Sequence, residues 1–244
     1  MDIFITMLIV VLYFGLILAL IPVILKSLLR VPIELVRKFQ HIGFASSIFI
    51  FSERGHEWVD VVIMIVIFGT FIFFMMWLIE KAPNYNKFFV DRDKLGGEMK
   101  RSLLMAMGVF ALLFTLFGGL LPNASYTHVV IAVMSWGIGD AIAAIFGKYL
   151  GKRKLNSPGV DPNKTWLGSV TMSISVAIVV FFMVLFYAFE PWWVALISAV
   201  VIAVVATSIE AYSKKGLDTL WIPLGVASVL YGLNWMFIWI MGGL

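Results

Sequence analysis

The chain has 244 residues, of which 62% are hydrophobic and only 13% are charged. A soluble domain carries about 25% charged residues, so this composition excludes a soluble globular enzyme and a disordered chain. The absence of cysteine excludes a disulfide scaffold, and a net charge of +4 is too small to favour nucleic acid as a partner.

Uncharged segments long enough to cross a membrane follow one another along the chain. A spanning helix needs roughly 20 apolar residues. One expected span carries a single charge, Asp140, and another, 39–52, is short. In chain order the spans are expected at 3–25, 39–52, 61–79, 102–127, 127–147, 165–189, 191–209 and 219–244. The sequence therefore predicts an all-α polytopic membrane protein with about eight transmembrane helices, forming one catalytic domain over residues 1–244.

The basic residues indicate how these spans are oriented, because Lys and Arg concentrate in cytoplasmic loops. If both termini face outside, all of the 18 Lys and Arg residues except Arg54 lie on the cytoplasmic side. We therefore expect both termini outside. Since no targeting signal is evident beyond the spans, we expect the plasma membrane of a prokaryote.

Ionisable residues near membrane depth gather at the predicted cytoplasmic edge, and this favours an enzyme. Such residues are costly in a membrane, so each is a functional candidate. A transporter would place them near the midplane, whereas an enzyme with a soluble co-substrate would gather them at one face. The set comprises Arg37, Lys38, His41, Glu98, Asp140, Lys164, Glu210 and Asp218.

Asp140 begins a row of small residues. In a helix, Asp140, Gly147 and Gly151 share one face. Small residues allow a polyphosphate to approach closely, and a carboxylate beside phosphate needs a cation between them, normally Mg²⁺. The alternative is that the row serves only helix packing, although packing does not explain the carboxylate.

The loop that follows is rich in cations, among them Lys148, and ends in Lys164 and Thr165 before the next span. A Lys and a hydroxyl at a helix N-terminus predict an anion site, with Gly168 keeping the first turn open. Asn163 precedes Lys164 where a Walker A loop needs Gly, so that motif is absent. The alternative is that the loop cations only fix the topology.

Two further groups of ionisable residues are candidates. Arg37 and His41 share a helix face beside Lys38, and could clamp phosphate oxygens or anchor the chain at the membrane surface. Glu210 and Asp218 flank a short loop, where they could bind a metal ion or activate a hydroxyl. Alternatively, this second pair forms ion pairs with the Lys residues at 214 and 215.

Four sequence blocks resemble one family. They are R-K-F-Q-H, G-D-A-I-A-A-I-F-G-K-Y-L-G-K, K-T-W-L-G-S and T-S-I-E-A-Y-S-K-K-G-L-D-T-L-W-I-P. Their order is similar to that in the dolichol kinase, phytol kinase and CTP-dependent diacylglycerol kinase family, which is related to the phosphatidate cytidylyltransferases. The matching positions are Arg37, Lys38, His41, Gly139, Asp140, Gly147, Gly151, Lys164, Thr165, Gly168, Glu210, Asp218 and Pro223.

The resemblance covers residues 36–223 and implies CTP as phosphoryl donor, Mg²⁺ as cofactor and a long-chain lipid alcohol as acceptor. Two positions depart from the family pattern: Leu167 stands where Glu is usual, and Thr219 where Asn is usual. The additional signature of the cytidylyltransferase branch has no match in this chain, which favours phosphoryl transfer over nucleotidyl transfer.

The sequence therefore predicts an integral-membrane lipid kinase acting at the cytoplasmic face on a polyprenol, a phytol-like alcohol or diacylglycerol. Asp140 and Asp218 would hold Mg²⁺, and Glu210, Asp218 or His41 would accept the alcohol proton. Phosphates would be bound by Arg37, Lys38, Gly139, Gly147, Lys148, Gly151, Lys164, Thr165 and Gly168. Expected partners are the lipid alcohol, the nucleotide, membrane lipids and, as an option, a second copy of the chain. The alternatives are a CTP-dependent cytidylyltransferase and a small transporter or flippase.

Overall fold

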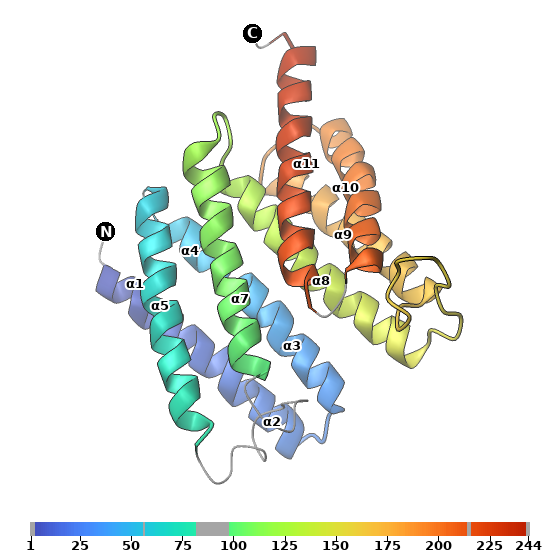
Figure 1. The fold of residues 1–244 in the computed structure, drawn as a ribbon. Helices are drawn as coiled ribbons and strands as arrows, with labels where there is room; N and C mark the ends of the chain where they lie inside the picture. The colour runs from blue at the N-terminus through green and yellow to red at the C-terminus, as the bar shows by residue number, and fades with distance from the viewer. Residues whose placement is uncertain (1–2, 56, 82–97, 214–215, 243–244) are drawn as a thin grey trace. The chain divides into compact units, whose positions relative to one another are not determined.

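The computed structural model describes residues 3–55, 57–81, 98–213 and 216–242, and every regular element in these ranges is a helix (Figure 1). The all-α architecture predicted from the sequence is confirmed. The chain divides into two compact units, Met1–Gly119 and Leu120–Leu244. The single catalytic domain expected over residues 1–244 stays a prediction.

The first unit begins with one long helical run. It consists of α1 (Ile3–Tyr13), the π-helix η1 (Phe14–Leu20) and α2 (Ile21–Ser27). The next helices, α3 (Ile33–Ser46) and α4 (Ile48–Arg54), run back along it, because α3 contacts α2 and η1 while α4 contacts α1. Helices α5 (Trp58–Ile79) and α7 (Glu98–Leu113) pack on each other, and α7 continues into the π-helix η2 (Phe114–Leu120).

Phenylalanine side chains fill the core of the first unit. Phe14 of η1 meets Phe68 of α5 with a ring-centroid separation of 4.5 Å, and Phe44 of α3 meets Phe110 of α7 at 5.2 Å. All four rings are buried. Aromatic pairs at such separations add to the gain from burying apolar surface, so these contacts hold the long helices of the unit together.

Seven helical segments in the described part of the chain are long and apolar enough to cross a membrane. The remaining expected span, 39–52, falls in α3 and α4, which are separated only by Ser47. Together these helices cover 33–54, about 33 Å at 1.5 Å per residue, which is enough to cross a hydrocarbon core of about 30 Å. The count of eight spans and the placement of both termini outside stay predictions.

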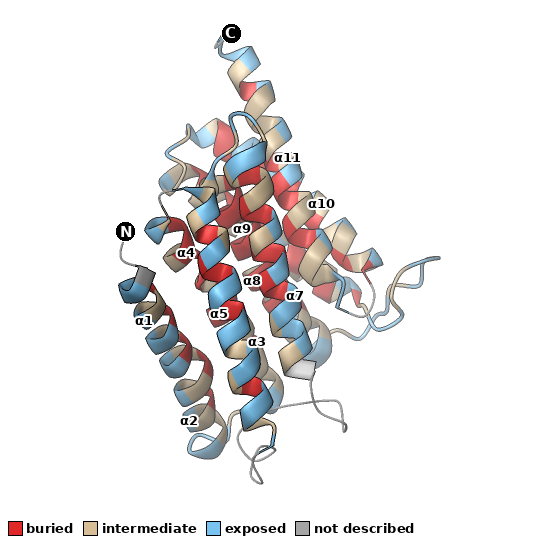
Figure 2. Cartoon of the chain, turned by 60° about the vertical axis from the view of Figure 1, so that its left-hand side comes forward, coloured by how far each residue is buried: buried red, intermediate tan, exposed pale blue. Residues whose placement is uncertain are grey.

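The second unit is a bundle of four antiparallel helices (Figure 1). They are α8 (Tyr126–Tyr149), α9 (Trp166–Phe186), α10 (Trp192–Tyr212) and α11 (Asp218–Ile240). Both α8 and α10 pack against α9 and α11, so the bundle closes on itself. Most of α8 is buried (Figure 2).

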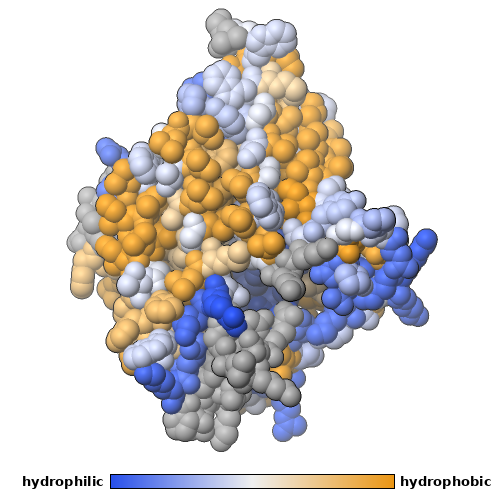
Figure 3. Space-filling view, viewed as in Figure 1, coloured by the Kyte–Doolittle hydropathy of each residue, from blue (hydrophilic) through white to orange (hydrophobic). Residues whose placement is uncertain are grey.

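Apolar side chains cover much of the surface of the helices. Phe182, Val200 and Val204 are more than half exposed on α9 and α10, and hydrophobic side chains spread over the sides of the bundle in Figure 3. Hydrophilic side chains gather instead on the loop that follows α8 (Figure 3). An apolar flank with polar loops is the surface expected for helices surrounded by lipid.

Candidate functional site

Four charged side chains of the second unit form one cluster, and they come from four separate parts of the chain. They are Asp140 of α8, Lys164 just before α9, Glu210 of α10 and Asp218 at the start of α11. The Lys164 Nζ atom forms an ion pair with Glu210 Oε1, and the charges of Asp140 and Asp218 also act on Lys164. The structure thus brings together four of the residues that the sequence singled out.

The cluster is largely withdrawn from solvent. Asp140 is 8% exposed, and the side chains of Glu210 and Lys164 are 5% and 21% exposed. Burial disfavours the charge on Lys164, but the carboxylate of Glu210, followed by those of Asp140 and Asp218, holds its pKa above the ordinary value of 10.5. Lys164 is therefore a fixed cation at neutral pH. Within the described residues, Glu210 Oε2 is buried without a hydrogen-bond partner.

The loop between α8 and α9 holds Lys164 in place. It folds back on itself, so that the amide of Leu155 donates to the carbonyl of Lys164 at 3.0 Å. The amide of Asp161 donates to the carbonyl of Ala211 at 3.3 Å, which fastens the loop to the end of α10. Gly159 has a φ of +84°, a backbone conformation that favours glycine. These contacts bring Lys164 beside Glu210.

The glycines predicted to admit a phosphate lie where α8 meets α9. A Cβ atom on Gly147 would come within 3.0 Å of Thr165 Oγ1 and 3.3 Å of Gly168 Cα. A Cβ on Gly151 would overlap Thr165, and one on Gly139 would press on α9 side chains. The packing alternative therefore has a direct structural basis, while phosphate binding by these glycines stays a prediction.

Thr165 caps the N-terminus of α9. Its Oγ1 accepts a hydrogen bond from the amide of Gly168 at 3.1 Å and lies 3.5 Å from the carbonyl of Gly147. The amide of Trp166 donates to the carbonyl of Arg153 at 3.0 Å. Two N–H groups of the first turn are thus already bonded within the protein. The anion site expected at this N-terminus stays a prediction.

The remaining predicted phosphate-binding residues belong to other elements. Arg37, Lys38 and His41 belong to α3 of the first unit, and Lys148 is exposed in the last turn of α8. Lys38 is buried. The phosphate-binding roles of all four stay predictions.

Glu34 is a neighbour of Arg37 that the sequence reasoning missed. Arg37 donates from Nη2 to Glu34 Oε1 at 2.6 Å, and both side chains are mostly buried. The sequence did offer a signal for this pair, because residues three apart on a helix lie on the same side and can interact.

Some predicted residues lie outside the described ranges. The lysines at 214 and 215, considered as alternative partners of Glu210 and Asp218, are among them, and the side chain of Glu98 is not described either.

The cluster suits a metal ion that is shared with a ligand. In the described ranges, no three His, Cys, Asp or Glu side chains form a group that could hold a metal. Magnesium is usually held by one or two carboxylates together with substrate phosphates and water. Asp140 and Asp218 supply such carboxylates, and Glu210 Oε2 is a buried oxygen that still lacks a donor. Magnesium binding by Asp140 and Asp218 stays a prediction.

Comparison with known proteins gives one family and one relative. Residues 2–208 match the model of the cytidylyltransferase family, a range that includes Asp140 and Lys164 but ends before Glu210 and Asp218. A phytol kinase from Synechocystis sp. is 27% identical over 218 residues, which is 88% of this chain and 86% of that protein. No solved structure matches the chain.

Proposed function

Because the chain belongs to the cytidylyltransferase family and carries seven described helices that could cross a membrane, we propose that it is an integral-membrane kinase for isoprenoid alcohols with CTP as phosphoryl donor. The observation that carries the proposal is the buried cluster of Lys164 with Asp140, Glu210 and Asp218. It lies in a chain similar over 88% of its length to a phytol kinase. Phosphoryl transfer depends on positioning and charge neutralisation, which such a cluster can supply.

Each charged residue has a distinct role in this proposal. Asp140 and Asp218 hold the Mg²⁺ that neutralises the phosphate oxygens when the nucleotide is bound. Lys164 binds a phosphate oxygen and stabilises the negative charge of Glu210. Glu210 Oε2, which lacks a hydrogen-bond donor in the described structure, accepts the proton of the alcohol.

The reaction balances without a further reactant. The alcohol oxygen attacks the γ-phosphorus of CTP, and the bond from that phosphorus to the β,γ-bridging oxygen breaks. CDP leaves, the lipid becomes a monophosphate, and the alcohol proton passes to Glu210 and then to water. We place these events on the cytoplasmic side, where the nucleotide is available, in a prokaryotic plasma membrane.

The test is to follow label from CTP in the purified protein in lipid nanodiscs. With label on the γ-phosphate, we expect transfer to phytol or farnesol and release of CDP. The Asp140→Asn variant, purified in the same way, controls for contaminating kinases. Transfer that is equal in the wild-type protein and this variant would contradict the assignment of the cluster.

The second candidate is a cytidylyltransferase, which the description of the matching family favours. Such an enzyme moves the α-phosphate with its cytidine onto a lipid phosphate and releases pyrophosphate. Label on the α-phosphate of CTP therefore separates the two reactions. Its appearance in a lipid when phosphatidate is supplied would replace the kinase assignment with nucleotidyl transfer.

A further inference from the structure

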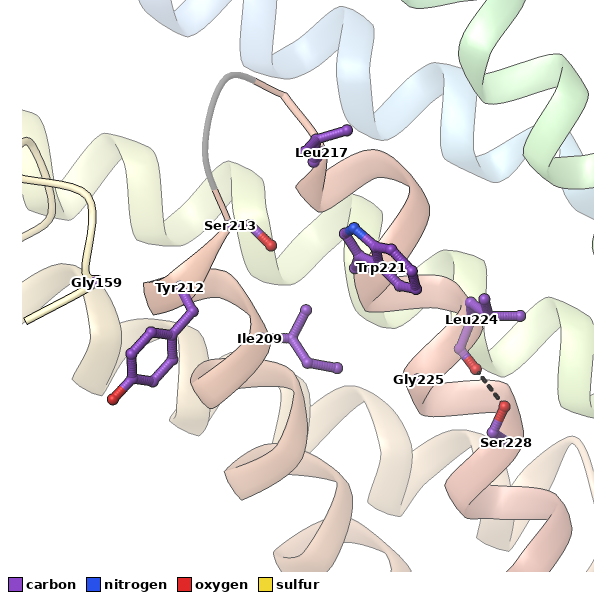
Figure 4. Close-up of a pocket in the computed structure, with 9 residues that line it drawn as sticks. All are labelled: Gly159, Ile209, Tyr212, Ser213, Leu217, Trp221, Leu224, Gly225 and Ser228. Carbon is purple, nitrogen blue, oxygen red and sulfur yellow. Dashed lines mark hydrogen bonds between the residues drawn. The ribbon is translucent and has the colours of Figure 1, made fainter.

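A pocket of about 680 Å³ opens between α10 and α11 of the second unit. Figure 4 shows Ile209 of α10 and Ser213, directly after this helix, on one side, and Trp221 and Gly225 of α11 on the other. Its volume lies within the range of pockets that hold small organic ligands, about 300–1,000 Å³. The pocket belongs entirely to one unit, and its lining comes from α10, α11, the residues at their facing ends and Gly159 of the loop between α8 and α9.

The pocket is mainly apolar. Its lining extends from Leu217, directly before α11, to Ser228 of α11, which is about 16 Å along the helix at 1.5 Å per residue. Trp221 is 50% exposed and Leu217 is 42% exposed, so the pocket is open at the surface of the unit. An apolar pocket with a long open side suits a flexible hydrocarbon chain better than a compact polar metabolite.

One end of the pocket adjoins the charged cluster. Ile209 and Ser213 flank Glu210 in sequence at the end of α10, and Leu217 directly precedes Asp218. Asp218 and Gly225 are seven residues apart and share one face of α11. Ser213 is buried at this end. The pocket therefore combines an apolar length with a polar end next to two of the carboxylates.

We propose that this pocket binds the isoprenoid chain of the acceptor alcohol, with the hydroxyl end near Ser213 and the chain directed along α11 toward Ser228. The identity of the ligand rests on the proposed kinase function, whereas the location of the site rests on the pocket. Gly225 sets how closely α10 and α11 pack beside the pocket, because a Cβ atom at this position would overlap the side chain of Ile209. A larger residue at position 225 displaces Ile209, which lines the pocket, and so changes the volume open to the chain.

The first test compares two glycine variants of the same helix. Gly225→Leu displaces Ile209 and reshapes the pocket, and we expect the KM for phytol to rise about tenfold or more relative to the KM for CTP. Gly232→Leu is the matched control, because a Cβ at Gly232 has no atom within 4 Å, and it should leave both KM values near those of the wild-type protein. An unchanged KM for phytol in Gly225→Leu would overturn the proposal.

The second test needs neither a variant nor turnover. The wild-type protein in nanodiscs is irradiated with a diazirine analogue of farnesol in the absence of nucleotide, and labelled peptides are mapped. We expect label on peptides that contain Ile209 or Trp221, and its loss when excess phytol is added. Label confined to other helices, or insensitive to phytol, would overturn the site. If label maps to the pocket but no phosphoryl transfer occurs, the proposed function fails while the binding site stands.

Discussion

Loss of Lys164 should destabilise the protein more than loss of Glu210, although the two residues form one ion pair. Lys164 is the cation that acts on three carboxylates, Glu210, Asp140 and Asp218. Lys164→Met leaves three negative charges in one buried site. Glu210→Gln leaves the ammonium group facing the two remaining carboxylates and keeps an acceptor oxygen on the side chain.

The difference can be stated in energy. Removing one partner from a buried ion pair costs about 3–5 kcal/mol, the range expected for Lys164→Met. Replacing Glu210 by Gln exchanges one hydrogen bond for a weaker one and should cost about 1 kcal/mol. The double variant, which combines Lys164→Met with Glu210→Gln, should be more stable than Lys164→Met alone. The difference should be about 1 kcal/mol or more, because the double variant carries one fewer unpaired carboxylate.

The assay is unfolding of the purified protein in mixed micelles as the fraction of SDS is raised, followed by tryptophan fluorescence. The order of midpoints should be wild type, Glu210→Gln, double variant and Lys164→Met. Equal midpoints for the two single variants would refute the reasoning, because they would mean that Lys164 stabilises only Glu210. The reasoning would also be refuted if the loss of stability in the double variant equalled the sum of the losses in the two single variants.

The same ion pair gives a dependence on pH with a defined sign. The pKa of Lys164 in the folded protein is raised above its ordinary value of 10.5. Its contribution to stability is therefore fully present below pH 10.5, and is lost as the pH rises through the higher folded value. The difference in midpoint between wild type and Lys164→Met should be constant from neutral pH upward and shrink only above pH 10.5. A difference that already falls near neutral pH would contradict this assignment.

Three further variants test the remaining parts of the site. Asp140→Asn should lower turnover by about a hundredfold or more with little change in yield or unfolding midpoint, and full activity would contradict its assignment as a metal ligand. Gly151→Ala should cost about 1–3 kcal/mol by overpacking against Thr165, as measured by the unfolding midpoint. Gly232→Ala, which has open space around it, serves as its control. Thr165→Val removes the cap of α9 and should cost about 1 kcal/mol, whereas Thr165→Ser should retain most of the stability in the same assay.

Hydropathy is sufficient to find the seven long apolar helices of the described residues, because the length of an apolar run reflects the thickness of the membrane. It does not reveal how a helix is wound. The π-helix η1 has the same apolar composition as the helices around it, yet Gln40 of α3 donates to the carbonyl of Leu18 within it at 2.9 Å. That contact joins residues far apart in sequence. The break between α3 and α4 at Ser47 likewise cannot be recognised from the composition of the sequence.

The candidate site was predictable residue by residue but not as an arrangement. Asp140, Lys164 and Glu210 stand out in the sequence because charge near membrane depth is costly. The pairing of Lys164 with Glu210 joins positions 46 residues apart, and depends on a loop whose folding no local pattern indicates. The hydroxyl of Thr165 suggested an anion site, whereas in the structure it caps α9.

The position of Lys164 reconciles its structural contact with its proposed role toward phosphate. An ammonium group carries three donors, and the ion pair with Glu210 uses one of them. The side chain retains 21% of its exposure, so part of it remains accessible to a ligand. Lys164 can therefore pair with Glu210 and bind a phosphate oxygen at the same time. It follows that Lys164→Met should impair turnover beyond its effect on stability, whereas Glu210→Gln should lower turnover with phytol without weakening the binding of CTP.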